Sequence, residues 1–163
     1  MKKVDVKRLV RLAVVAAVYV VVTMAIAPLA FGPVQFRFSE ILVLLCFYKR
    51  DYAYSLVIGC AIANLFSPMA ALDVPFGTLA TLFAVLGIIF LAKNLWVASL
   101  FPVILNGIIV GIELYVAFNE PLLFSMGTVA LGELVVVTVL GVPIFKLLEK
   151  NDYIKNRILL AQA

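Results

Sequence analysis

The chain has 163 residues, of which 66% are hydrophobic, and its mean hydropathy is +1.19. A soluble domain is about half apolar, so this composition excludes a water-soluble globular protein and predicts an all-α integral membrane protein, with residues 1–163 as a single domain. The net charge of +4 does not indicate nucleic-acid binding, because the cations stand beside apolar runs. The chain has no histidine, which excludes His-based metal sites, catalytic triads and imidazole relays.

The first apolar run follows a basic segment, as in a secretory signal peptide. The cations of this segment are Lys2, Lys3, Lys7, Arg8 and Arg11. A cleavable peptide is one interpretation, because the run ends in Ala-Ile-Ala at 25–27. We favour an uncleaved transmembrane helix over residues 9–27, because the run is long for a signal peptide, Pro28 follows the cleavage point, and more apolar spans come after it.

Six transmembrane helices are predicted in total. They cover residues 9–27, 39–48, 52–66, 76–92, 95–118 and 122–148. The second is too short to cross a bilayer, which takes about 20 residues. It therefore either tilts beneath the preceding loop, residues 29–38, or begins earlier and carries Arg37 inside. Ser67 and Pro68 begin a second predicted loop, which closes near Asp73 and Pro75, and residues 149–163 form a polar tail at the membrane surface.

The lysines and arginines predict the orientation. Of the 13, all except Arg37 fall at the termini or in the turns on one side of the six-helix arrangement. The positive-inside rule then places both termini and the polar tail in the cytoplasm, and Arg37 on the outer side.

A short polar string, residues 35–40, separates the first two apolar runs. Arg37 and Glu40 are three residues apart in it, and so share a face wherever this string is helical. A paired charge at a membrane mouth indicates a functional site. The structural alternative is a salt bridge that fastens the loop to the end of the helix.

Five carboxylates are predicted in the outer half of the membrane or at its outer surface. They are Glu40, Asp73, Glu113, Glu120 and Glu133. Glu133 is near the middle of the last predicted helix, where a charge costs roughly 2.5–3.5 kcal/mol, so it must face a cavity, a partner or water. Asn106 lies at a similar depth, and Glu113 is two turns further along the same helix face.

These groups predict a binding pocket that opens to the outside. Further polar or aromatic members are Gln35, Asn64, Phe36, Phe38, Phe76 and Tyr115. Such a pocket suits a planar, hydrogen-bonding heterocycle, because a carboxylate accepts two donors from a guanine-like edge while rings stack on its faces. Structural alternatives remain: Glu133 as a polar bridge between helices and Asp73 as a turn residue. For Glu120 we favour the turn role.

Small residues also recur at helical spacing. Ala13 and Ala17 are one turn apart in the first helix, and Gly107 and Gly111 repeat this spacing in the fifth. Such faces allow close helix approach in lipid, either within the chain or against another membrane subunit. The cysteines, Cys46 and Cys60, read as buried small hydrophobes without a disulfide. The chain lacks a phosphate-binding G-x-x-x-x-G-K-[ST] motif, and no cofactor is predicted.

The ordered set of polar motifs resembles the substrate-binding (S) components of energy-coupling factor (ECF) vitamin transporters, and within these the QueT family. The stretches that carry the resemblance are residues 35–40, residues 59–64, Asp73 with residues 76–82, Asn106 with Gly111 and Glu113, Gly132 with Glu133, and residues 141–143. The resemblance extends from the first predicted helix to the end of the last.

This resemblance implies a non-enzymatic, multi-pass subunit in a bacterial plasma membrane. The implied ligand is a queuosine precursor, a 7-deazaguanine that bears a cyano or aminomethyl group. The implied partners are a transmembrane coupling subunit of the EcfT type, which docks at Ala13 and Ala17, and two ATPase subunits of the EcfA type. The loaded S component would topple in the membrane to deliver its ligand, with residues 29–38 as a gate.

Three other functions stay open at this stage. One is an S component for a different flat vitamin, such as a hydroxymethylpyrimidine precursor of thiamin. The second is a stand-alone channel or carrier that acts as an oligomer. The third is an intramembrane enzyme that acts on lipid, although no nucleophile–base pair supports it.

Overall fold

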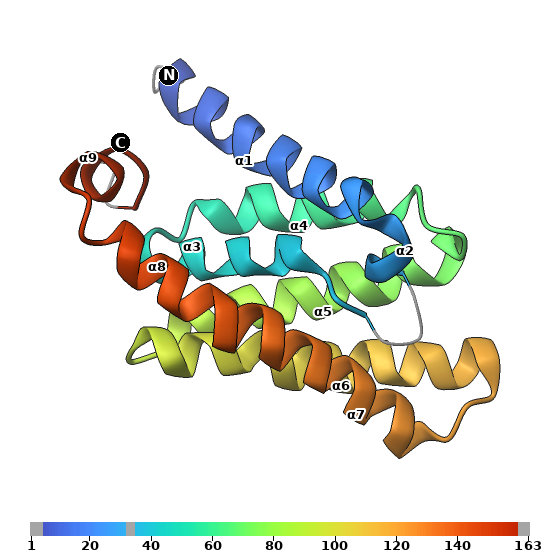
Figure 1. Cartoon of the computed structure of the whole chain (residues 1–163). Coiled ribbons are helices and arrows are strands. Elements are labelled where there is room, and N and C mark those ends of the chain that lie inside the picture. Colours follow the sequence, from blue (N-terminus) through green and yellow to red (C-terminus); the bar gives the residue numbers. More distant parts are fainter. Residues whose placement is uncertain (1–4, 32–34, 160–163) are drawn as a thin grey trace.

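The computed structural model describes residues 5–31 and 35–159, and helices dominate this part of the chain (Figure 1). The predicted gate loop and polar tail lie partly outside these residues. The start of α1 and the last described helical residues, 152–159, lie at one end of the bundle, which we call the terminal end. Within this described part, four helical stretches are long and apolar enough to cross a membrane, and residues 38–48 and 52–64 form two shorter apolar helices. The chain is therefore an all-helical protein with several candidate membrane spans.

The first helix, α1 (Val6–Ala25), begins where the Asp5 side chain accepts a hydrogen bond from the backbone N–H of Lys7. It ends three residues before Pro28. A four-residue helix, α2 (Ala27–Ala30), follows at once with Pro28 in its first turn, so this part of the predicted loop is helical. Tyr19 and Thr23 are the buried residues of α1, and most of its surface faces away from the bundle.

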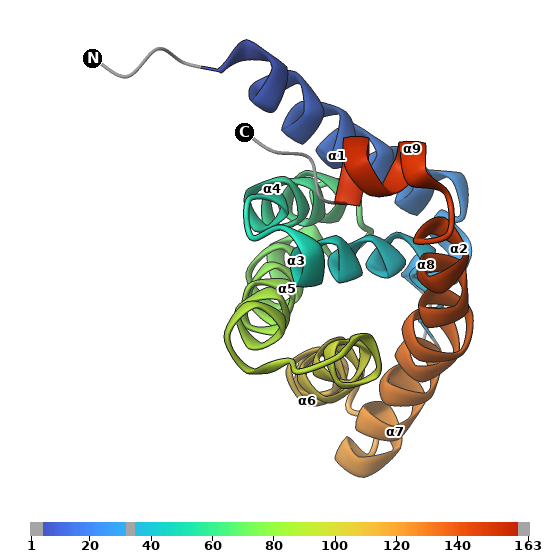
Figure 2. The same ribbon diagram turned by 90° about the vertical axis from the view of Figure 1, so that its left-hand side faces the viewer.

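A short helical segment runs through the centre of the bundle (Figure 2). It consists of a 3₁₀-helix, η1 (Phe38–Leu44), and one α-helical turn, α3 (Leu45–Tyr48). The 3₁₀ rise per residue is larger, so the segment spans about 20 Å where a pure α-helix would span about 16 Å. Arg37 lies just before η1, so the predicted alternative in which this helix begins earlier and includes Arg37 is wrong.

The surrounding elements pack in chain order around this segment. They are α1, α4 (Tyr52–Asn64), α5 (Ala70–Leu91), α6 (Leu95–Phe118) and the last long helix. The last helix is continuous through α7 (Leu122–Glu133), the π-helix η2 (Leu134–Gly141) and α8 (Val142–Leu148), which confirms the predicted span over 122–148. The wide π turns begin directly after Glu133, a position typical of functional sites.

Helix α5 begins earlier than predicted. Ala70 is its first residue, so Asp73 lies in the helix and the predicted loop closure near Pro75 is wrong. The start is stabilised by Ser67, whose Oγ accepts a hydrogen bond from Met69 N at 3.0 Å and donates one to the Asp73 carboxylate. Pro75 removes a single backbone hydrogen bond near the helix start, and the rest of α5 continues past it.

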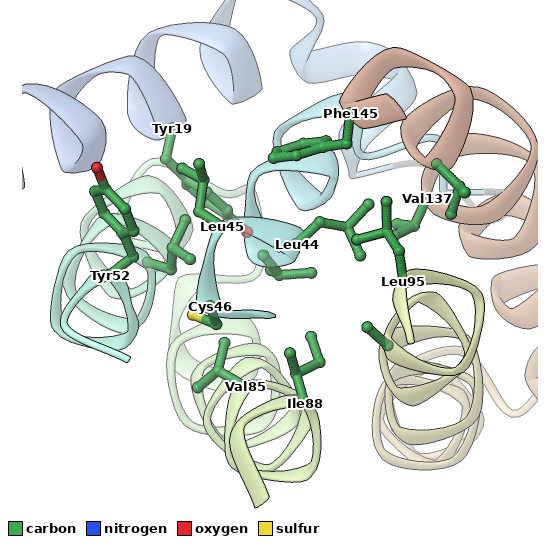
Figure 3. Close-up of a cluster of buried hydrophobic side chains, with 14 of the residues drawn as sticks. Tyr19, Leu44, Leu45, Cys46, Tyr52, Val85, Ile88, Leu95, Val137 and Phe145 are labelled. Atoms are coloured by element: carbon green, nitrogen blue, oxygen red, sulfur yellow. The ribbon is translucent and has the colours of Figure 1, made fainter. Parts of the chain in front are cut away.

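An apolar core occupies the terminal half of the bundle (Figure 3). The side chains at its centre come from every long element and include Leu44, Leu45, Cys46, Val85, Ile88, Val137 and Phe145. The helical segment of the tail, α9 (Asp152–Ile154) with η3 (Lys155–Leu159), joins this core through the buried Leu159. Tyr52 fixes it further by donating a hydrogen bond to the Ile158 carbonyl at 2.6 Å.

Candidate functional site

Arg37 and Glu40 are both buried, with 3% and 0% of their surface exposed, but they do not pair. Among residues 5–31 and 35–159, Arg8 Nε forms an ion pair with Asp51 Oδ2 at 2.9 Å, but no ion pair joins Arg37 to Glu40, so the salt bridge considered as the structural alternative does not form. The Arg37 guanidinium donates to Gln35 Oε1 at 3.5 Å and lies over the Phe31 ring, 5.7 Å from its centroid. Arg37 Nε has no partner in the described part of the chain.

Hydroxyl groups hold Glu40 in place. Tyr19 of α1 donates a short hydrogen bond to Glu40 Oε1, and Thr81 of α5 donates to the same oxygen at 3.3 Å. One turn along α1, Thr23 Oγ1 is 2.7 Å from Ser39 Oγ. Sequence reasoning missed Tyr19 and Thr23, although two polar residues four positions apart in an apolar helix mark a buried polar face.

Asn64, at the end of α4, ties α4 to the start of α5. Its Nδ2 donates to the Asp73 carbonyl at 2.8 Å and to Cys60 Sγ at 3.4 Å. A Cβ on Gly77 would lie 2.5 Å from Asn64 Nδ2 and 3.5 Å from Arg37 Nη1, so glycine is needed for this close approach. Asn64 Oδ1 has no partner in the described structure.

Cys60 takes part in the same polar network. It is buried and free, as predicted, and its sulfur also lies 3.2 Å from Thr81 Oγ1 and 3.6 Å from the Gly77 carbonyl. The prediction that Cys60 acts as a plain small hydrophobe was therefore incomplete.

Glu133 forms a polar bridge between helices, which was the structural alternative to its predicted role in a pocket. Asn106 of α6 donates from Nδ2 to Glu133 Oε1 at 2.8 Å, while Glu133 Oε2 has no partner among the described residues. The polar string, residues 35–40, can approach α7 beside this carboxylate because the preceding residue is Gly132. A Cβ at position 132 would lie 2.0 Å from the Gln35 carbonyl oxygen. The bridge thus orients a carboxylate whose second oxygen is available.

Glu113 of α6 is the least satisfied side chain in the interior. It is fully buried, and apart from the adjoining carboxyl group of Asp73 neither of its carboxylate oxygens has a hydrogen-bond partner in the described structure. Its carboxyl group adjoins that of Asp73, which is 2% exposed. Native proteins leave few buried polar atoms unpaired, because each costs about 1–3 kcal/mol.

The structure therefore brings together eight of the predicted site residues. They are Gln35, Arg37, Glu40, Asn64, Asp73, Asn106 and Glu133, with Glu113 beside Asp73; we call these eight residues the polar cluster. Five of them leave buried polar atoms without partners, and most of these atoms are acceptors. A polar ligand that donates hydrogen bonds would satisfy them.

The aromatic residues are less well placed than predicted. Tyr115 is 47% exposed and points away from the face of α6 that carries Glu113, so the structure does not bring it to the polar cluster. Phe38 is 37% exposed. Phe36 and Phe76 are half-buried, and Phe36 packs against the apolar core.

The small residues of α1 lie on the opposite side of that helix from Tyr19. Ala13 and Ala17 are exposed and line a groove of about 1110 Å³ between α1 and α4, with mainly apolar walls. The two helices approach closely at the base of this groove, where a Cβ on Gly59 would lie 3.1 Å from the Ala16 carbonyl oxygen.

Comparison with known proteins shows to which family the chain belongs. The family described as QueT transporter matches residues 9–150. A relative from Lactococcus lactis subsp. cremoris (strain MG1363), described as queuosine precursor transporter QueT, is 34% identical over 148 residues, which cover 82% of this chain and 87% of the relative. No solved structure matches the chain significantly.

Proposed function

Because the chain belongs to the QueT transporter family, which consists of membrane transporters and not enzymes, we propose that it binds a queuosine precursor of the 7-deazaguanine type at the polar cluster. The observation that carries this proposal is the set of buried, unpaired acceptors on Glu133, Glu113, Glu40 and Asn64. A ligand rich in N–H groups supplies the missing donors.

Glu133 is the carboxylate best prepared to read a guanine-like edge. Asn106 holds one of its oxygens, so the orientation of the group is set before the ligand arrives. The N1–H and exocyclic amino group of a 7-deazaguanine can both donate to this carboxylate. The neighbouring Arg37, with an unpaired Nε, supplies a donor for the carbonyl of the same ring.

For transport, we propose that the chain is the S component of an ECF-type importer with six spans and both termini in the cytoplasm. The twelve-to-one distribution of cations supports this orientation, as does the position of the start of α1 and of residues 152–159 at the same end of the bundle. The groove beside Ala13 and Ala17 is suited to a helix of the coupling subunit, since small residues allow close approach in lipid. Separate ATPase subunits would supply the energy for toppling.

Calorimetric titration of the purified, detergent-solubilised protein tests the binding proposal. We expect sub-micromolar binding of 7-cyano- or 7-aminomethyl-7-deazaguanine and none of hydroxymethylpyrimidine. Glu133→Gln should weaken binding by more than about tenfold, because the amide offers one acceptor where the carboxylate offers two. Glu120→Gln is the control, since this carboxylate lies in the turn before α7. Tight binding of hydroxymethylpyrimidine alone would show that the ligand is a pyrimidine and not a deazaguanine. An unchanged affinity of Glu133→Gln for the deazaguanine would show that Glu133 is not part of the binding site.

Co-purification tests the docking proposal. Replacing Ala13 and Ala17 together by leucine fills the groove between α1 and α4, so assembly with the coupling subunit should be lost while ligand binding stays within about twofold. Leucines at the exposed positions Val14 and Val18 of the same helix are the control. A complex that still forms with the Ala13/Ala17 variant would show that the coupling subunit docks elsewhere.

A further inference from the structure

A second groove lies on the surface between α4 and α5, two helices that pack side by side (Figure 2). Its volume is about 360 Å³. The walls are mainly apolar and include Ala53, Val57 and Ile58 of α4 with Leu82, Leu86 and Ile89 of α5. Tyr54 and Ile58 line both this groove and the one beside α1, so they form the ridge between the two. Because Ile58 is 54% exposed, the α4–α5 groove opens to the surface that faces lipid in a membrane protein.

The length of this groove matches one leaflet of a bilayer. Its lining residues fall within positions 50–58, at the start of α4, and positions 82–90, towards the end of α5. Both of these stretches begin at the terminal end of the bundle. Eight residues of α-helix rise about 12 Å. The hydrocarbon core of a bilayer is about 30 Å thick, so each leaflet contributes about 15 Å. The groove therefore extends over the depth that one acyl chain occupies.

The mouth of the groove at the terminal end carries an uncompensated positive charge. Arg50 and Asp51 are the charged residues that line it. Asp51 is paired with Arg8, whereas Arg50 forms no ion pair in the described part of the chain. The Arg50 guanidinium instead lies over the exposed ring of Phe90, 5.7 Å from its centroid. Since the N–H groups of a guanidinium lie in its plane, this stacking leaves them available to an anion.

We propose that the α4–α5 groove binds one anionic phospholipid, with an acyl chain along the groove and the phosphate beside Arg50. The apolar walls match the chain, and the guanidinium matches the phosphate. Arg50 also stands just before α4, where the helix dipole favours negative charge. Basic pockets between transmembrane helices bind anionic headgroups in this way, and an exposed tyrosine such as Tyr54 is typical of the membrane–water interface.

This site goes beyond the proposed function. None of its lining residues belongs to the polar cluster, and the selection of an anionic lipid does not depend on which ligand the polar cluster binds.

Native mass spectrometry of the full-length protein in detergent tests the lipid site. The protein is titrated with dioleoylphosphatidylglycerol and with dioleoylphosphatidylcholine, which have the same chains and differ in net charge. We expect one phosphatidylglycerol to bind at least about fivefold more tightly than phosphatidylcholine, since a single basic residue near the membrane surface favours an anionic lipid by about this factor. Glycerol 3-phosphate should not bind at the same concentrations, because it lacks the acyl chain. Equal affinities for the two lipids would overturn the proposal.

Removal of the charge at the mouth gives the sharper result. Arg50→Gln should lower the affinity for phosphatidylglycerol by about fivefold, to that for phosphatidylcholine, and change the latter by less than about twofold. Lys93→Gln is the matched control, because Lys93 is an exposed cation in the turn after α5 and does not line the groove. An equal loss in both variants would overturn the site, since it would show a general effect of positive charge at the terminal end.

Filling the groove tests the position of the chain. Ala53→Phe places a ring between α4 and α5 and should weaken binding of both lipids by at least about tenfold. Ala61→Phe, two turns further along α4 and outside the groove, is the control. Thermal unfolding without added lipid checks that each variant is folded; if Ala53→Phe is not, the comparison of Arg50→Gln with Lys93→Gln decides alone. Unchanged binding of phosphatidylglycerol to folded Ala53→Phe, or equal binding of glycerol 3-phosphate to the parent protein, would overturn the proposal.

Discussion

The helical segment at the centre of the bundle, η1 with α3 (residues 38–48), has one end in an apolar environment and the other in a polar one. The α3 end, with Leu44 just before it, is enclosed by the apolar core, whereas the η1 end places Ser39 and Glu40 among hydroxyl, amide and carboxylate groups. The apolar end is closely packed, and the polar end leaves buried atoms unpaired. A single short helical segment therefore anchors the apolar core at one end and contributes Glu40 to the polar cluster at the other, so substitutions at its two ends should have different consequences.

The largest effect on stability is expected at the apolar end. Leu44→Ala removes a fully buried side chain from the core, and such truncations cost about 2–5 kcal/mol. We expect a clearly lower thermal unfolding temperature in detergent, with the ligand affinity of the folded protein changed by less than about threefold. Leu131→Ala, at a position 62% exposed on α7, is the control. Equal unfolding temperatures of Leu44→Ala and Leu131→Ala would contradict the assignment of fold stability to the apolar end of the segment.

At the polar end, Gly132→Ala should act mainly on binding. The new Cβ would lie 2.0 Å from the Gln35 carbonyl oxygen, so the polar string that carries Arg37 must move away from α7. We expect ligand affinity to fall by at least about tenfold and stability to fall by about 1–3 kcal/mol. Gly127→Ala is a matched control on the same helix, because its Cβ would meet no atom within 4 Å. Equal affinity of both variants would show that the position of residues 35–37 is not critical for the ligand.

Much of the apolar framework could be predicted from sequence. Helix α6 has the predicted bounds because Asn94 caps its start and the left-handed residue Asn119 ends it, and both residue types mark helix ends. The start of α5 was mispredicted because Pro75 was taken as a boundary, whereas the helix begins after the N-cap Met69, where the Ser67 hydroxyl bonds to both Met69 N and the Asp73 carboxylate.

The members of the polar cluster could be predicted, but their pairing could not. A spacing of three residues brings Arg37 and Glu40 together only if both are helical, and Arg37 precedes the 3₁₀-helix. Glu40 instead accepts hydrogen bonds from Tyr19, 21 positions away, and from Thr81, and such contacts depend on how α1 and α5 pack. Asp73 and Glu113 likewise meet only because α5 and α6 are neighbours.

The smallest effect is expected for Tyr19→Phe, which removes the single hydroxyl by which α1 contacts Glu40 of the polar cluster. Glu40 then keeps only the Thr81 hydrogen bond on Oε1. A net loss of about 0.5–1.5 kcal/mol in stability follows, and ligand affinity should fall by about three- to tenfold because Glu40 loses its orientation. Tyr115→Phe, on the exposed face of α6, is the control for both measurements. Because Tyr19 shares α1 with Ala13 and Ala17, the effect of ligand on co-purification with the proposed coupling subunit should also be compared between the two variants. Loss of this ligand effect in Tyr19→Phe but not in Tyr115→Phe would show that the Tyr19 hydroxyl couples ligand binding to assembly. The same ligand effect in both variants would limit the role of Tyr19 to the polar cluster.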